Sequence, residues 1–202
     1  MIQIYHVTNT RGIRPIWLCE ELGIEYSYTK IDFSQEYRRQ PEWRAMNPVG
    51  KVPVLEDGDL RMFESGAMVE YILTRYGKGK LHPDPSSDAY AHYLQWLWFG
   101  EATLSRPLGE IVNHRREFPG ELEIPAVVSE MGNRAGECLL AIADAVDGQQ
   151  FICGDEFTAA DIMVGYGLHL SEMLVPDKMP EKLAPYWARL KARTGFQIAR
   201  SA

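Results

Sequence analysis

The chain has 202 residues, of which 46% are hydrophobic and 24% are charged, as is usual for globular proteins. This length allows one core or two small unequal ones. A net charge of −7 argues against a nucleic-acid or anionic-membrane surface, although Arg14, Arg38 and Arg39 could form a local basic cluster. No apolar run approaches the roughly 20 residues of a membrane span, and the N-terminus lacks signal-peptide features. We therefore expect a cytoplasmic protein with neither nucleic acid nor membrane as a partner.

The three cysteines and five histidines form no recognisable metal site. Cys19, Cys138 and Cys153 are an odd set without a Cys-x-x-Cys pair, and the histidines lack ligand spacing. We expect no bound metal, and we interpret the cysteines as buried, reduced residues with a structural role.

The first third of the chain predicts a small mixed sheet with helices packed on it. A helix between two strands permits parallel pairing, whereas Asp57-Gly58 is a hairpin signal. The predicted strands are 2–5, 26–33, 52–56 and 60–63, and the predicted helices are 12–22 and 67–76.

Beyond a segment rich in turn-forming residues, the remaining pattern is helical. The predicted helices are 89–104, 125–146, 159–174 and 181–193. The third is apolar nearly all round, which marks a buried central helix. Thr158 and Asp161 predict a capping box at its start, with Phe157 and Ile162 as a hydrophobic staple. We therefore divide the chain into a sheet-containing domain (1–77), a linker (78–87) and an all-helical domain (88–202).

Two segments of the first domain outline a pocket for a small peptide. Pro53 interrupts a strand-like run, so the Val52–Pro53 bond is a candidate cis peptide that would leave the Val52 main chain open to an extended guest. Ser65 offers a hydroxyl and a helix N-terminus to a carboxylate, while Glu64 offers a negative charge to an ammonium group. The implied guest carries both charges at one end.

Four motifs in order resemble those of the soluble glutathione transferases. They are Asn47-Pro48-x-Gly50-Lys51-Val52-Pro53-x-Leu55, Glu64-Ser65, Glu20-Glu21-Leu22-Gly23, and the segment from Phe157 to Ile162. The resemblance covers the whole chain, and the tract from Gln95 to Ala102 is similar to bacterial members. It implies a thioredoxin-like domain with a four-stranded sheet followed by an all-α domain, and usually a homodimer.

The resemblance also implies glutathione as co-substrate and assigns residues to it. Val52, before the cis proline Pro53, would pair with the cysteinyl unit, while Glu64 and Ser65 would hold the γ-glutamyl end. Lys51 could reach a glutathione carboxylate or could be a solvated turn residue.

The position that activates the glutathione thiol departs from the family pattern. Members use Tyr, Ser or Cys near the start of the first helix, but the turn here reads from Tyr5 to Gly12 without serine or cysteine. Asn9 and Thr10 are the candidate catalytic donors, and Tyr5 is expected to point into packing. Arg11 could add a positive field to the site or be an exposed residue at the helix start.

An electrophilic, hydrophobic second substrate would lie against the aromatic helix of the second domain. These side chains could equally form core, because aromatic residues at helical spacing commonly do. The candidates are Tyr93, Trp96, Phe99, Arg106, His114 and Tyr166. The expected activity is conjugation of glutathione to the electrophile in a detoxification role. Alternatives are a glutathione-dependent disulfide reductase or peroxidase, and a non-catalytic binding protein with the same fold.

Overall fold

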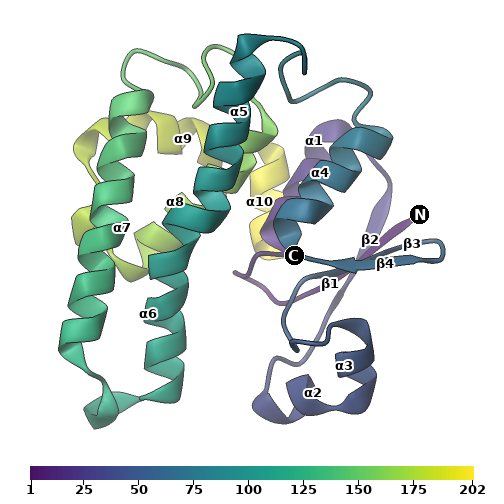
Figure 1. The fold of residues 1–202 in the computed structure, drawn as a ribbon, viewed down its shortest axis with the longest axis vertical. Coiled ribbons are helices and arrows are strands. Elements are labelled where there is room, and N and C mark those ends of the chain that lie inside the picture. Colours follow the sequence, from purple (N-terminus) through teal and green to yellow (C-terminus); the bar gives the residue numbers. More distant parts are fainter. The chain divides into compact units, whose positions relative to one another are not determined.

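The computed structural model describes residues 1–202, which form two compact units. The first comprises Met1–Lys80 together with Lys191–Ala202, and the second comprises Leu81–Leu190. Figure 1 shows strands in the first unit and a helical arrangement in the second. None of the helices combines the length and apolar character needed to cross a lipid bilayer.

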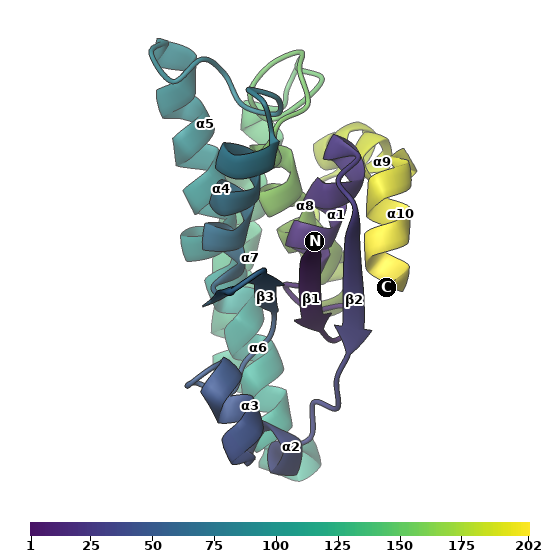
Figure 2. The same cartoon turned by 90° about the vertical axis from the view of Figure 1, so that its right-hand side faces the viewer.

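The first unit contains the predicted four-stranded mixed sheet. Its strands are β1 (Ile2–His6), β2 (Tyr26–Lys30), β3 (Val54–Asp57) and β4 (Leu60–Phe63), in the spatial order β2-β1-β3-β4. β1 and β2 are parallel and lie side by side in Figure 2, whereas the other pairs are antiparallel. This is the predicted thioredoxin-like arrangement, although β2 is shorter than the 26–33 run.

Helices α1 (Ile13–Leu22) and α4 (Ser65–Tyr76) pack against each other in this unit. Burial alternates along β1, with Ile2 and Ile4 inside, as the period of a half-buried strand requires. Two short helices absent from the sequence prediction follow β2: α2 (Gln35–Arg39) and α3 (Pro41–Met46).

The last helix, α10 (Thr194–Ser201), packs on α1. The rings of Trp17 and Phe196 lie 5.0 Å apart, and Arg193 donates to both carboxylate oxygens of Glu21 at 2.8 and 2.6 Å. A Cβ at Gly195 would lie 2.9 Å from Trp17 Cδ1, so a larger residue would disturb this close approach. Whereas the sequence placed 88–202 in one domain, these contacts group the final residues with the first unit.

The second unit is built from helices. They are α5 (Asp88–Trp98), a π-helical segment (Phe99–Leu104), α6 (Ser105–Glu117), α7 (Pro125–Ala145), α8 (Ala159–Leu174) and α9 (Ala184–Ala192), with short 3₁₀ turns at 120–122, 176–178 and 181–183. The sequence prediction ended a helix at 104, but the chain continues through the π-helical segment into α6. Pro107 lies in α6 directly after the π-helical segment, where the hydrogen-bonding pattern of the helix changes.

Helix α8 is the buried centre of this unit, as predicted, because every residue from 159 to 171 is inside. The predicted capping box is present at its start. The Asp161 carboxylate accepts from the main-chain N–H groups of Thr158 and Ile152 at 2.8 and 2.9 Å, and from the Tyr186 hydroxyl at 2.8 Å. This network ties α8 to the preceding loop and to α9.

Candidate functional site

The loop before β3 is shaped by Asn47. Its side-chain amide donates to the Lys51 carbonyl at 2.9 Å, and its side-chain oxygen accepts from Val49 N–H at 3.1 Å. Gly50 has a φ of 63°, and a Cβ there would lie 2.6 Å from the Arg38 carbonyl oxygen. Both residues of the Asn-Pro-x-Gly motif therefore have a structural reason for their identity.

The Val52–Pro53 peptide bond is cis, as predicted. The main-chain N–H and C=O of Val52 make no hydrogen bond with the rest of the chain. Val52 is half-buried, and Pro53 is buried. One residue next to the sheet thus has both a donor and an acceptor available to an extended peptide.

Sheet register brings the predicted binding residues to one edge. Val54 pairs with Tyr5 on one side and with Phe63 on the other. Because both ladders are antiparallel, Pro53 continues next to the end of β1, and Glu64 follows β4 at the same edge. The structure therefore brings together the Val52–Pro53 segment, the Glu64–Ser65 segment and the turn after β1.

Ser65 is the first residue of α4 and is buried, and the Arg14 Nη1 donates to its Oγ at 2.9 Å. A hydroxyl that accepts this bond still has its own hydrogen to donate. The positive guanidinium and the N-terminus of α4 both favour an anion beside Ser65. Glu64, with a φ of 76°, is exposed and offers its charge to solvent or a cation.

Arg14 is a residue whose place the sequence analysis missed. The sequence predicts a local basic cluster of Arg14, Arg38 and Arg39, but the Arg14 side chain is fully buried. The available signal was its position within the apolar helix face, between Ile13 and Pro15, which are also buried. A surface basic cluster that includes Arg14 is therefore wrong.

The turn after β1 uses both of its threonine hydroxyls internally. Thr10 Oγ1 donates to the Val7 carbonyl at 2.6 Å, and Thr8 Oγ1 donates to the main-chain oxygen of Ala202 at 2.9 Å. Asn9 between them is exposed and has a φ of 61°. Arg11 is half-buried. Of the two predicted donors, Asn9 is exposed, whereas the hydroxyl of Thr10 donates within the turn.

Other titratable side chains near the turn are poorly suited to hold a thiolate. The Tyr5 hydroxyl donates to Glu56 at 2.9 Å, and burial, followed by this hydrogen bond, raises the pKa of Tyr5. His6 is fully buried, and burial, with the charge of Lys30, lowers its pKa to about 4. Burial also raises the pKa of the Cys19 thiol to about 12, so this cysteine stays protonated at neutral pH.

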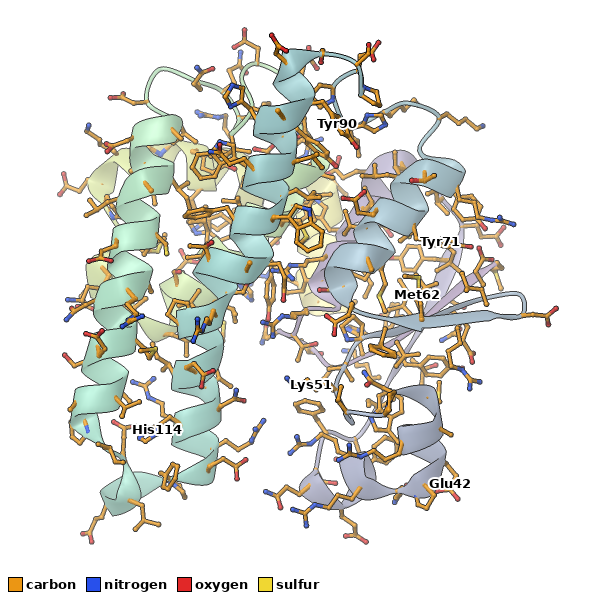
Figure 3. All side chains as sticks on the ribbon, in the orientation of Figure 1. Glu42, Lys51, Met62, Tyr71, Tyr90 and His114 are labelled. Atoms are coloured by element: carbon orange, nitrogen blue, oxygen red, sulfur yellow. The ribbon has the colours of Figure 1, made fainter.

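The side chains expected to line a second-substrate pocket are dispersed through the helical unit. Tyr93 and Tyr166 are buried, with exposures of 1% and 3%. Trp96 and Phe99 are half-exposed, and their rings lie 5.0 Å apart. His114 lies near the far end of α6, where its Nε2 accepts from the main-chain N–H of Ile124 at 2.9 Å (Figure 3).

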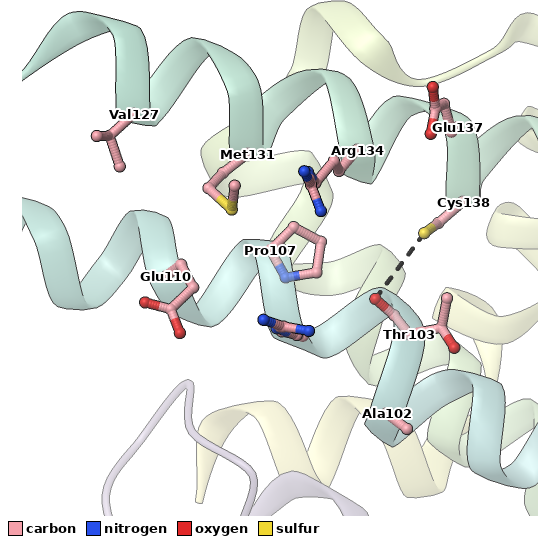
Figure 4. Close-up of a pocket in the computed structure, with 10 residues that line it drawn as sticks. Ala102, Thr103, Pro107, Glu110, Val127, Met131, Arg134, Glu137 and Cys138 are labelled. Carbon is pink, nitrogen blue, oxygen red and sulfur yellow. Dashed lines mark hydrogen bonds between the residues drawn. The ribbon is translucent and has the colours of Figure 1, made fainter.

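Arg106, the remaining member of that set, is exposed and lines a cavity between α6 and α7 (Figure 4). This cavity has a volume of about 500 Å³. The other lining residues are Ala102, Thr103, Pro107, Glu110, Val127, Met131, Arg134, Glu137 and Cys138. The cavity contains two arginines and two glutamates, and none of the other expected second-substrate residues lines it.

Lys51, a predicted glutathione-binding residue, is exposed in the loop before β3 (Figure 3).

Comparison with known proteins identifies similar chains. A family model described as "Glutathione S-transferase, N-terminal domain" matches residues 2–74. Glutathione S-transferase 3 of Schizosaccharomyces pombe is 25% identical over 94% of this chain and 82% of its own length. Glutathione S-transferase 4 of Zea mays is 31% identical over 74% and 67% respectively. The theta class glutathione S-transferase of Xanthomonas axonopodis pv. citri, solved with glutathione bound, is 26% identical with a TM-score of 0.85, covering 100% of this chain and 97% of that one.

Proposed function

We propose that this chain, which belongs to the glutathione S-transferase family, binds glutathione at the sheet edge formed by Val52, Glu64 and Ser65 and joins its thiol to an electrophilic small molecule. The observation that carries the proposal is that two kinds of binding group meet at this edge. One is the main-chain N–H and C=O of Val52, which make no hydrogen bond within the chain, and the other is Ser65 at the N-terminus of α4, which accepts a hydrogen bond from Arg14. The similar Xanthomonas enzyme solved with glutathione bound supports the same ligand.

The proposed arrangement matches each end of the tripeptide with a chemical partner. The N–H and C=O of Val52 would pair with the cysteinyl unit as a neighbouring strand would. Ser65 would donate to the carboxylate of the γ-glutamyl residue, and Glu64 would face its ammonium group. Lys51 and Arg11 would add positive charge near the remaining carboxylate and the sulfur.

Asn9 would stabilise the thiolate by donating from its side-chain amide. A thiol with a pKa near 8.5 is mostly protonated at neutral pH, and lowering this pKa by two units needs about 2.7 kcal/mol of differential stabilisation. In conjugation, the thiol proton would pass to solvent and the thiolate sulfur would form a bond to an electrophilic carbon. In a substitution the leaving group would depart with its bonding electron pair, and in an addition the displaced π-electron pair would take up a proton from solvent. Holding the tripeptide in one orientation makes this attack effectively unimolecular.

The turn chemistry also allows a second function. Because the usual serine, cysteine or tyrosine is absent and both threonine hydroxyls are used within the chain, the protein could instead reduce disulfides or peroxides, or bind glutathione without turnover. Trp96 and Phe99 are the side chains that we propose to contact the electrophile, since they keep exposed aromatic surface.

We further propose a cytoplasmic homodimer with a detoxification role.

Separate Asn9→Ala and Thr10→Val variants, each assayed for conjugation and for disulfide reduction, test the thiol-activation claim. We expect Asn9→Ala to lower kcat/KM for conjugation at least about tenfold, because a donor to the developing charge is lost. Asn133→Ala, at an exposed position of α7, is the control. Unchanged conjugation activity in Asn9→Ala would show that another residue activates the thiol. A wild-type protein that binds glutathione but neither conjugates it nor reduces disulfides would favour the alternative of a non-catalytic binding protein.

A further inference from the structure

The turn that presents Asn9 is anchored on both sides. Asn9 has a left-handed φ of 61°, a conformation that asparagine adopts more readily than most residues with a side chain. On its C-terminal side, the N–H and the hydroxyl of Thr10 both donate to the Val7 carbonyl, at 3.2 and 2.6 Å. On its N-terminal side, Thr8 is tied to the end of α10. These flanking contacts hold the backbone of the turn on both sides of Asn9.

The main-chain oxygens at the end of α10 accept hydrogen bonds from the turn and from β2. The last carbonyl groups of a helix accept no hydrogen bond from an N–H group of the same helix. Here the main-chain oxygen of Ala202, the last residue, accepts from Thr8 Oγ1 at 2.9 Å, and the Ser201 carbonyl accepts from Lys30 Nζ at 3.3 Å. The last turn of α10 is thereby attached to the turn after β1 and to β2.

Helix α10 is itself fixed to α1, the helix that starts directly after the turn. The Trp17–Phe196 ring contact and the paired hydrogen bonds from Arg193 to Glu21 hold it there. The turn is therefore held between β1, α1 and α10, and Thr8 is the side chain that connects it to α10.

We infer that Thr8 is a positioning residue for thiol activation: it connects α10 to the turn and holds the backbone of Asn9 where its amide meets the sulfur of glutathione. The inference rests on the proposed function. The Thr8 hydroxyl hydrogen is directed to Ala202, so Thr8 acts through Asn9 and does not donate to the sulfur. Its loss should change thiol ionisation more than glutathione affinity, because the predicted binding groups of Val52 and Ser65 are not touched by it.

Two measurements on each full-length variant test this inference. Calorimetry gives the Kd of reduced glutathione, and the ultraviolet absorbance of the thiolate, followed against pH, gives the pKa of the bound thiol. For Thr8→Val we expect this pKa to rise by about one unit while Kd changes less than about threefold. Thr8→Ser, which keeps the hydroxyl, should retain the wild-type pKa.

Two further variants test whether the thiol pKa depends on the packing of α10. Phe196→Ala, which loosens α10 from α1, should raise the thiol pKa in the same direction, whereas Thr74→Val, at an exposed position of α4, should leave it unchanged. If Thr8→Val does not fold, Thr8→Ala, which also removes the hydroxyl, decides. A wild-type thiol pKa in Thr8→Val or in Phe196→Ala would overturn the inference alone. A wild-type protein that does not lower the thiol pKa of bound glutathione would overturn the proposed thiol activation as well.

Discussion

At the scale of single residues, the proposed glutathione site depends on Ser65 and on the buried Arg14, which contacts it. The guanidinium fixes the hydroxyl by donating to its oxygen at 2.9 Å, which leaves the hydroxyl hydrogen for a ligand carboxylate. Ser65 therefore has a specific donor role in the proposed complex.

Replacing Ser65 by alanine should weaken glutathione binding by roughly 1–3 kcal/mol, because the carboxylate loses a charge-assisted hydrogen bond. Calorimetric titration of the variant and the wild type measures this difference. Ser129→Ala, at an exposed position of α7, serves as the control. Equal affinities for the Ser65→Ala variant and the wild type would remove Ser65 from the site.

The sequence predicted some of these residues because their chemistry is local. A proline that interrupts a strand, and an acidic residue and a serine before a helix, can be recognised without tertiary structure, and Val52–Pro53 is cis as predicted. Arg14 could not be placed, because its burial depends on which face of α1 the rest of the unit covers. Similarly, helical spacing alone does not separate the buried Tyr93 from the half-exposed Trp96.

At the scale of secondary-structure elements, the helices with strong end signals were predicted best. The start of α8 follows from Thr158 and Asp161, which supply a reciprocal cap. By contrast, the π-helical segment 99–104 leads into α6 without such a signal, so the sequence prediction ended there. Helices α2 and α3 are short, and periodicity is weak over so few residues.

The Thr158→Ala variant should lower the free energy of unfolding by about 1 kcal/mol, because a cap of α8 is lost. Chemical denaturation of the variant and the wild type measures this change. Thr74→Ala, at an exposed position inside α4, should stay within about 0.5 kcal/mol of the wild type. A Thr158→Ala variant as stable as the wild type would show that Asp161 and its remaining partners suffice to hold the start of α8.

At the scale of the whole molecule, the sequence predicted the fold class, but it predicted neither the helix at 194–201 nor the packing of that helix on α1. The thioredoxin-like sheet follows from strand order and the Asp57-Gly58 hairpin, and the helical remainder follows from periodicity. The packing of α10 on α1 joins residues far apart in the chain through Trp17, Phe196 and the Arg193–Glu21 pair. Local sequence patterns carry no information about such a long-range contact.

Titration of the isotope-labelled wild-type protein with reduced glutathione, followed by amide NMR, tests the central claim most directly. If an extended tripeptide pairs with the Val52 main chain and its carboxylate meets the start of α4, the amide resonances of Val52 and Ser65 should shift together and saturate. Saturable binding that leaves both resonances unmoved, or no binding at millimolar glutathione, would contradict the account.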